Sequence, residues 1–394
     1  MSVFDDPSLR VTDSGNQLSV THQHELNSAA DLYVSAAYSD FHYNTVNPYR
    51  APMVGYYHAY TDTQGQAIQG EVNAQLLTGN HHLLVGIELG QDLLARQHLS
   101  FSVNPAALNT IEVNINPLAK RYAGFIQDEW NIVPNVALNL GVRRDAATSE
   151  QPTISPRLGA VWQINADWTS KFLLGRAYRS PSAYEKLFGD GINVLSNPNL
   201  RAEKLDTREV IFTWQQHALQ SWQLSLFDNQ LQHVIQQVDV NGLGQLQFQN
   251  TSQAHRQGAE LSWQMHASDE AHWSASLAQN RTPNASSISD NTPKHVAKAS
   301  YTVALFNAAT LSNELQFISP RHYQWRATPQ QLPSTTLLNV TLNLPNLGWR
   351  GLQGQLRIDN VLNRSAAQPA TAEMLTANIP QTLRTFSFKL DYAF

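Results

Sequence analysis

The sequence predicts an all-β fold, an antiparallel transmembrane β-barrel with long loops at one end and short turns at the other. Three observations predict it. Segments that alternate apolar and polar residues recur along nearly the whole chain, and only 14% of the 394 residues are charged. No apolar stretch reaches the ~18 residues that a membrane-spanning helix needs, and the mean hydropathy is −0.35. A barrel with one face in lipid and one in water accounts for all three.

The alternation defines the individual strands. At about 9–11 residues for each crossing, it predicts roughly 16 to 18 strands. The clearest lie at 68–76, 81–89, 136–142, 154–164, 259–266, 338–344 and 352–358. The last strand ends the chain, with Phe386, Phe388, Leu390, Tyr392 and Phe394 on one face and Ser387, Lys389, Asp391 and Ala393 on the other.

The predicted connections have two lengths, which is the asymmetry of an outer-membrane barrel with short periplasmic turns and long extracellular loops. Turn residues mark the short ones, at Pro134-Asn135, Ala166-Asp167, Ser268-Asp269 and Gly348. Long segments are predicted near 42–65, 98–118, 180–206, 235–252, 282–293, 321–334 and 363–381. No compositional break divides the chain, so one domain over residues 1–394 is expected.

Composition excludes several classes of function. The chain has no cysteine, which rules out disulfides and thiol chemistry, and its net charge of −5 gives no reason to expect nucleic acid as a partner. No nucleophile elbow, phosphate loop or two-histidine helix motif is present, so we expect neither an enzyme nor a cofactor. Nine Trp, thirteen Tyr and fourteen Phe could supply interfacial girdles. Residues 1–7 lack the basic and apolar segments of a signal peptide.

Several short motifs in one order resemble the TonB-dependent outer-membrane receptors of Gram-negative bacteria. Residues 124–130 (GFIQDEW) and 138–145 (LNLGVRRD) resemble a central strand pair of that family. SPRLG at 155–159 and GRAYRSPS at 175–182 resemble the next strand pair of that family. Residues 197–207 contain a match to its Asn-Pro-Asn-Leu box and to the Glu-Lys that follows the box. Further matches are 250–261, 293–295 and 359–363. Phe394 stands where the family carries its terminal assembly signal.

The resemblance implies a receptor barrel of 22 strands with a plug domain inside it and a short box that engages TonB. Neither is recognisable in this chain, so we expect an N-terminally truncated barrel portion that could meet TonB only through a plug absent from it. Implied partners are outer-membrane lipid, the barrel-assembly machinery and a siderophore-type ligand. The implied function is energised uptake of a nutrient chelate, with a ferric siderophore favoured over cobalamin, another metal or a glycan.

Two groups of aromatic and basic residues are candidate ligand contacts, because rings and guanidinium groups can bind an anionic aromatic chelate. The alternative for some of them is an interfacial girdle. We call them the first aromatic set and the second aromatic set. The first set comprises Tyr43, Tyr49, Arg50, Tyr56, Tyr57, His58 and Tyr60, and the second comprises Arg321, His322, Tyr323, Trp325 and Arg326.

Charges predicted on the lumen side would face a plug in a complete receptor, where buried charge must be paired. They are Glu71, Glu88, Glu129, Arg143, Arg157, Glu260, Arg357 and Asp359. The His22-x-His24 and His81-His82 pairs have no third ligand nearby in sequence, so no metal site is predicted. Haem receptors of the family carry a histidine between the two boxes, and residues 182–196 contain none.

Three alternatives stay open at this stage. A passive outer-membrane pore would share the barrel without energised transport, and the chain could be a non-functional fragment of a receptor. A soluble β-sandwich would also alternate, but it would bury its apolar faces against each other.

Overall fold

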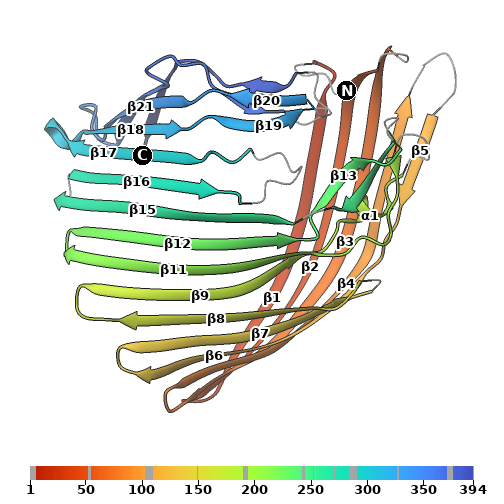
Figure 1. The fold of residues 1–394 in the computed structure, drawn as a ribbon, viewed down its shortest axis with the longest axis horizontal. Coiled ribbons are helices and arrows are strands. Elements are labelled where there is room, and N and C mark those ends of the chain that lie inside the picture. Colours follow the sequence, from red (N-terminus) through yellow and green to blue (C-terminus); the bar gives the residue numbers. More distant parts are fainter. Residues whose placement is uncertain are drawn as a thin grey trace.

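A single curved antiparallel sheet dominates the structure, a computed structural model that describes residues 6–51, 55–102, 110–148, 150–189, 194–241, 245–251, 253–268, 271–283, 291–325, 328–370 and 376–393. The sheet has 18 strands, and each pairs with its neighbours along the chain (Figure 1). This confirms the predicted fold class and strand number. Among the described residues, no helix is long and apolar enough to cross a membrane.

The first half of the sheet contains the longest strands. β5 and β6 both pair with β4, so they occupy one position in the sheet. The strands of this half are β1 (Arg10–Asn27), β2 (Ala30–Ala51), β3 (Gly55–Thr78), β4 (His81–Ser102), β5 (Thr110–Ile115), β6 (Lys120–Val133), β7 (Val136–Ala147), β8 (Thr153–Gln163) and β9 (Trp168–Arg179).

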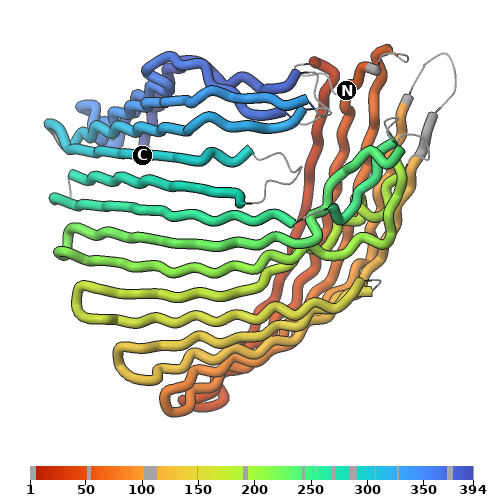
Figure 2. Tube along the Cα trace, in the orientation of Figure 1, coloured from red at the N-terminus to blue at the C-terminus, as the bar shows by residue number. Residues whose placement is uncertain are grey.

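The second half continues the same up-and-down order with strands of 8 to 15 residues, all shorter than β1 to β4. It consists of β11 (Glu203–His217), β12 (Gln220–Gln232), β15 (Ala254–Ser268), β16 (Ala271–Arg281), β17 (His295–Ala304), β18 (Thr310–Ile318), β21 (Thr335–Leu344), β22 (Leu352–Asp359) and β25 (Thr385–Tyr392). Within the described ranges no pairing joins β1 to β25, so the sheet has two edges. Figure 2 shows the N-terminal strands running at a steep angle to the C-terminal ones.

Small elements collect at the end of the sheet opposite the short turns, which we call the rim. They form in the long connections and are α1 (Ala183–Leu187), β10 (Val194–Leu195), β13 (Ile235–Asp239), β14 (Leu246–Asn250), β19 (Arg321–Trp325), β20 (Thr328–Leu332), β23 (Ala367–Pro369) and β24 (Asn378–Pro380). At the short-turn end, one 3-10 turn, η1 (Phe306–Ala308), joins β17 to β18. The predicted difference between the two ends of the sheet is therefore present.

The two faces of the sheet differ as the alternation predicted. On the convex face apolar side chains stand side by side across strands, as in the pairs Val72 with Ile87 and Leu261 with Leu277. These side chains stay exposed, with Ile87 at 54% and Leu277 at 52%. A soluble sandwich would bury them, so the exposed apolar face agrees with a lipid-facing surface.

Indole rings gather on the convex face near the short turns. Trp168 stacks on Trp214 with ring centroids 5.4 Å apart, and Trp222 lies 6.0 Å from Trp263. On the next strands Trp273 stacks on Tyr301 at 5.2 Å. Such rings are apolar with one polar edge, so this row has the composition of an interfacial girdle.

Two sequence-based expectations are wrong. Residues 42–65 are not a long loop, because β2 continues to Ala51 and β3 begins at Gly55. The segment 98–118 likewise contains the end of β4 and all of β5. The turn residues and aromatic rings in these segments favoured loops, but Val46, Thr61 and Thr63 continue the strand ladder. Polar residues on both faces concealed the period of two.

The helix α1 was not predicted either. Its signal is a capping box: the Ser182 hydroxyl accepts from the Glu185 amide, and the Glu185 carboxylate accepts from the Ser182 amide. Phe188, which follows the helix, packs with Leu99, Val113 and Ile115 in a buried apolar cluster. The cluster fixes α1 against the concave side of β4 and β5.

Candidate functional site

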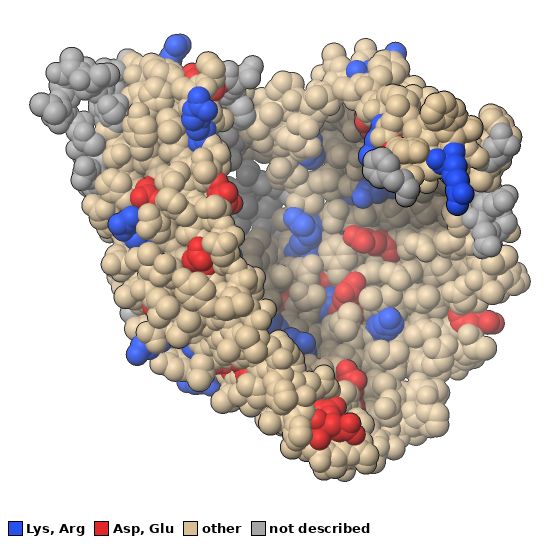
Figure 3. Space-filling model, turned by 180° about the vertical axis from the view of Figure 1, so that it is seen from behind, with Lys and Arg blue, Asp and Glu red and all other residues tan. Residues whose placement is uncertain are grey.

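A cavity of about 1160 Å³ lies on the concave face, between the inner sides of β2, β3, β4, β6 and β7. The chain segment that carries α1 borders it, with Ser180, Ala183 and Lys186 among its lining. Figure 3 shows acidic and basic side chains inside the hollow on this side of the molecule. Pockets for drug-sized molecules are about 300–1,000 Å³, so this cavity can hold a bulkier ligand.

An ion-paired group lies at the base of the cavity. Arg143 donates two hydrogen bonds to Glu88, at 2.5 and 2.7 Å, and a third to Asp145 at 2.9 Å. Its guanidinium carbon lies 5.7 Å from the centre of the Phe125 ring. Gly86 makes this arrangement possible, because a Cβ there would overlap the Phe125 ring. Bidentate pairing holds the guanidinium of Arg143 in one place in the cavity lining.

Two further arginines lie beside the cavity, and the sequence analysis missed both. Arg121 directs its side chain into it, whereas Arg96 is paired with Gln64 in the phase of His58 and Tyr60 and so points to the convex side. Arg121 donates to the two carboxylate oxygens of Asp92 at 2.5 and 3.1 Å, and Arg96 lies 3.5 Å from Asp62. About half of each arginine side chain stays exposed, 50% for Arg121 and 49% for Arg96. A signal existed for Arg121, which shares the inward phase of the strand at 124–130. Arg96 was missed because its strand was expected to end before it.

All eight predicted lumen charges lie on the concave face, as the cross-strand register shows. Of these, only Glu71, Glu88 and Arg143 line the cavity. Elsewhere on the face, Arg357 donates to Asp359 at 2.8 Å. The whole set is Glu71, Glu88, Glu129, Arg143, Arg157, Glu260, Arg357 and Asp359. Their role toward a plug stays a prediction.

The first aromatic set lies on β2 and β3 rather than in a loop, and it divides between the two faces. Tyr49 and Tyr57 are directly paired across the strands and stack with centroids 5.6 Å apart. Tyr56, His58 and Tyr60 alternate with Tyr57 and point to the opposite, convex side. They form a second stack, with Tyr56 5.1 Å and Tyr60 6.2 Å from His58.

The remaining members of the first set follow the same register. Tyr43 shares the inward phase of Tyr49, and Arg50 is paired with Tyr56. Tyr56 is also hydrogen-bonded, donating to Asp6 at 2.8 Å. Hydrogen bonds from the Ser8 hydroxyl and amide, and then from Tyr56, hold the pKa of Asp6 below its ordinary value.

Two members of the second aromatic set connect one rim hairpin to another. Arg321 donates at 2.9 Å to the Gln368 side chain and to the carbonyl of Ala367, and the Tyr323 hydroxyl donates to the carbonyl of Ala377 at 2.6 Å. Tyr323 is only 4% exposed. These contacts attach β19 and β20 to β23 and β24, so both residues have a structural role.

The other members of the second set lie nearer the surface or beyond the described residues. His322 is exposed and Trp325 is half-buried. Arg326 and the predicted assembly signal Phe394 lie outside the described residues.

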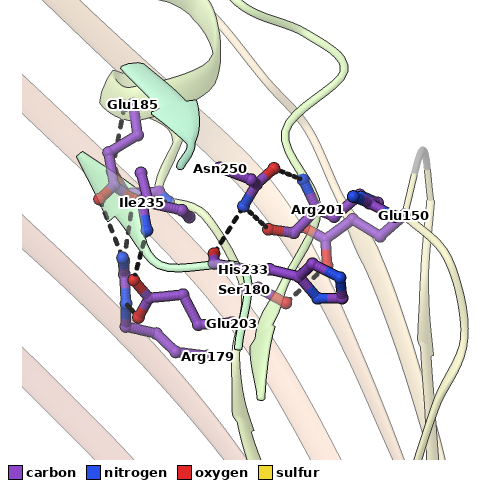
Figure 4. A network of polar contacts seen from close by, with 10 residues as sticks. Glu150, Arg179, Ser180, Glu185, Arg201, Glu203, His233, Ile235 and Asn250 are labelled. Carbon is purple, nitrogen blue, oxygen red and sulfur yellow. Dashed lines mark hydrogen bonds and ion pairs between the residues drawn. The ribbon is translucent and has the colours of Figure 1, made fainter. Parts of the chain in front are cut away.

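An acidic and basic group fixes α1 to the sheet at the rim (Figure 4). Arg179, at the end of β9, donates to Glu185 on α1 at 2.9 and 3.1 Å and to Glu203 on β11 at 2.7 Å. Glu203 also accepts from the amide of Ile235 at 2.7 Å. Burial opposes ionisation of Glu185, but hydrogen bonds from Arg179 and the Ser182 amide outweigh it and lower its pKa.

Asn250, also labelled in Figure 4, joins three segments of the chain near this group at the rim. Its side-chain amide donates to the carbonyls of Arg201 at 2.9 Å and His233 at 2.7 Å, while its oxygen accepts from the Arg201 amide at 2.8 Å. His233 has a positive φ of 57°. Burial, followed by the positive charges of Arg201 and Lys204, lowers its pKa.

No group of three or more His, Asp or Glu side chains that could hold a metal occurs among the residues that the structure describes. The two histidine pairs noted in the sequence, His22/His24 and His81/His82, differ in their contacts. His22 and His24 stack with centroids 6.1 Å apart, whereas His81 binds Asp128 at 2.8 Å and His82 lies 3.8 Å from Glu129.

Comparison with known proteins agrees with this architecture. The curated "Iron-regulated outer membrane virulence protein" of Vibrio cholerae is 26% identical over 166 residues, which cover 41% of this chain and 24% of that protein. The aligned segment therefore spans about a quarter of the curated relative.

Solved structures share the fold at low identity. The ferric-catecholate import receptor Fiu of E. coli K12 gives a TM-score of 0.73 at 13% identity, covering 98% of this chain and 65% of that one. The copper transporter OprC gives 0.79 at 14%, with coverages of 98% and 66%. The ferric yersiniabactin uptake receptor FyuA of Yersinia pestis gives 0.77 at 13%, with coverages of 98% and 62%.

The family model described as "TonB dependent receptor-like, beta-barrel" matches residues 2–363, nearly the whole chain. Receptors of this kind are outer-membrane transporters rather than enzymes. The chain therefore belongs to the TonB-dependent receptor β-barrel family.

Proposed function

We propose that the chain supplies the barrel of an outer-membrane receptor that takes up a ferric siderophore. The observation that carries the proposal is the large cavity with charged side chains in its lining, on the concave face of a sheet whose family is established. The name of the Vibrio relative records iron regulation, which is the response expected of an iron-uptake receptor.

The chemistry of the cavity supports an anionic, partly aromatic chelate. The half-exposed guanidinium group of Arg121 offers donors that its carboxylate partner leaves free, since an arginine has five. Phe41 and Leu118 contribute apolar wall to the same cavity. Stacking and charge-assisted hydrogen bonding together are what a catecholate ligand requires.

The aromatic sets have separate parts in this proposal. Tyr43, Tyr49 and Tyr57 are proposed ligand contacts on the inner side, and His322 and Trp325 are proposed contacts at the rim. Tyr56, His58 and Tyr60 point outward and are better suited to contact with the polar lipid region, the alternative role for this set. Arg50 and Arg326 stay candidates only.

The partners belong to the same proposal. Outer-membrane lipid would cover the exposed apolar face, the barrel-assembly machinery would recognise the C-terminal strand β25 with the signal residue Phe394, and TonB would act through a plug. Under this scheme the barrel and its rim capture the chelate, and energy for its passage comes from TonB.

Ligand binding tests the proposal directly. We expect ferric catecholate to quench the tryptophan fluorescence of the detergent-solubilised chain, with a neutral ferric hydroxamate and cobalamin as comparison ligands. Arg121→Gln should weaken catecholate binding by at least about tenfold, because it removes a charge-assisted contact. Arg144→Gln is the matched control, since Arg144 lies on the opposite face of the sheet from the cavity. Equal binding by both variants would reject the cavity as the ligand site.

Transport needs a second experiment in cells. Deletion of the full gene should abolish energy-dependent uptake of radioactive iron from the siderophore and slow growth under iron limitation. Uptake that persists without the membrane energy source would favour a passive pore.

A further inference from the structure

We propose that His266 and His272 form a metal-binding pair for a divalent copper or nickel ion on the concave face at the short-turn end. The two residues are directly paired across β15 and β16, one step before the turn. Their Nδ1 atoms lie 2.8 Å apart, and the rings are nearly perpendicular at 72°. The site is separate from the cavity, and its failure would leave the proposed uptake function untouched.

At 2.8 Å, the two Nδ1 atoms must share either a proton or a cation. Two neutral imidazoles that both carry their proton on Nε2 would direct two lone pairs at each other. Either one ring adopts the Nδ1-protonated form and donates to the other, or both nitrogens bind one cation. The second arrangement lets both rings keep the same tautomer.

The distance also favours one coordination geometry. Two nitrogens bound at about 2.0–2.1 Å and at right angles lie about 2.8–3.0 Å apart, whereas tetrahedral corners lie about 3.3–3.4 Å apart. The observed 2.8 Å agrees with adjacent corners of a square. Copper(II) and nickel(II) prefer square or tetragonal sites with nitrogen ligands, while zinc prefers tetrahedral ones.

The surroundings leave the pair open to solvent. His266 is exposed and shares the inward phase of Gln264, whereas Met265 between them points to the convex face and is paired with Trp273. A metal held here would therefore sit on the wet side of the sheet. A β-bulge follows His266, a feature that redirects side chains at the ends of strands.

Neighbouring polar groups are already bonded to each other. Ser274 pairs with Ser300 at 2.7 Å, and Thr302, directly opposite His272, pairs with Ser312 at 2.9 Å. No third His, Asp or Glu joins the pair within the described ranges. Among the described residues, two imidazoles would be the protein ligands, and water would complete the coordination of the ion.

Copper titration of the full chain in detergent near neutral pH tests the inference. We expect one tight equivalent of Cu²⁺ by calorimetry, with a tetragonal electron paramagnetic resonance spectrum split by two nitrogens. His272→Gln should weaken this site by at least about tenfold, the loss that removal of even an outer-shell partner produces. The double variant His266→Gln/His272→Gln should lose the equivalent.

The matched control is the other close histidine pair. The variant His22→Gln/His24→Gln removes two stacked rings whose centroids are 6.1 Å apart, so it should retain the tight equivalent. Cu²⁺ should also protect His266 and His272 of the unaltered chain from diethyl pyrocarbonate, mapped by mass spectrometry, which needs no substitution. A tight equivalent that survives the His266/His272 change, or equal modification with and without copper, would overturn the inference. Both of these outcomes are expected if His266 and His272 only share a proton and bind no metal.

Discussion

The two halves of the sheet build the rim in different ways. β2, β3 and β4 contain 22, 24 and 22 residues, about twice the 9–11 that cross a membrane. β21, β22 and β25 contain 10, 8 and 8. The first half reaches the rim by continuing its backbone ladder. The second half stops and adds separate hairpins that side chains hold in place. Stability at the rim should therefore depend on strand packing in one half and on a few side chains in the other.

The largest effect is expected from overpacking in the long-strand half. A Cβ at Gly86 would overlap the Phe125 ring and approach the Asn73 Cβ to 2.8 Å. Gly86→Ala should therefore lower the free energy of unfolding by about 1–3 kcal/mol. Gly124→Ala is the control, because a Cβ there meets nothing within 4 Å. Denaturant unfolding followed by tryptophan fluorescence measures both, and equal effects would contradict the packing argument.

The rim of the second half should respond locally instead. Asn250→Ala removes three hydrogen bonds that join β14 to the chain at Arg201 and His233. We expect a local loss of about 2 kcal/mol, seen as faster hydrogen exchange over 235–250. Gln249→Ala, which removes one side-chain bond to Gln247, should do much less. A matching fall in the stability of the whole sheet would show that the rim is not separate.

A smaller effect is expected at the next rim contact. Tyr323→Phe deletes the hydrogen bond to the Ala377 carbonyl but keeps the buried ring. The loss should be about 1 kcal/mol and should speed hydrogen exchange in both hairpins that the bond joins. His322→Gln serves as the control because His322 is exposed. Unchanged exchange in β23 and β24 would mean that Tyr323 does not hold the hairpins together.

The smallest effect should come from pH. Burial and the charges of Arg201 and Lys204 place the pKa of His233 below its ordinary 6.5. The unfolded segment then takes up a proton first, so local stability is present above about pH 6.5 and falls as the pH drops through that value. Protection from hydrogen exchange over 235–250, measured relative to the intrinsic rate at each pH, should fall between about pH 7.5 and 5.5. His233→Asn, which tolerates the positive φ, should remove this dependence. If His233→Asn keeps the same pH dependence, a group other than His233 causes it.

The comparison also explains what sequence could predict. The alternation of Leu83, Val85 and Ile87 identified β4, because lipid on one side and water on the other impose a period of two. Beyond the membrane both faces meet water, so residues such as His42, Asp62 and Gln64 break the apolar-polar alternation. The ends of β2 and β3 that lie nearest the rim were therefore not predicted. The lumen charges were predictable from phase. The cavity was not, because it depends on the curvature of the sheet and on the packing of Phe188 after α1 against Leu99, Val113 and Ile115, which are distant in sequence.

The account depends most on the opposite environments of the two faces, and the absence of cysteine makes a direct measurement possible. Single cysteines placed along β15 at Ala259, Glu260, Leu261 and Ser262 would carry spin labels in the full chain reconstituted into lipid. We predict alternation: labels at Ala259 and Leu261 relax with oxygen dissolved in lipid, and those at Glu260 and Ser262 with a water-soluble nickel complex. Uniform accessibility along the strand would contradict a sheet with one face in lipid and a polar site on the other.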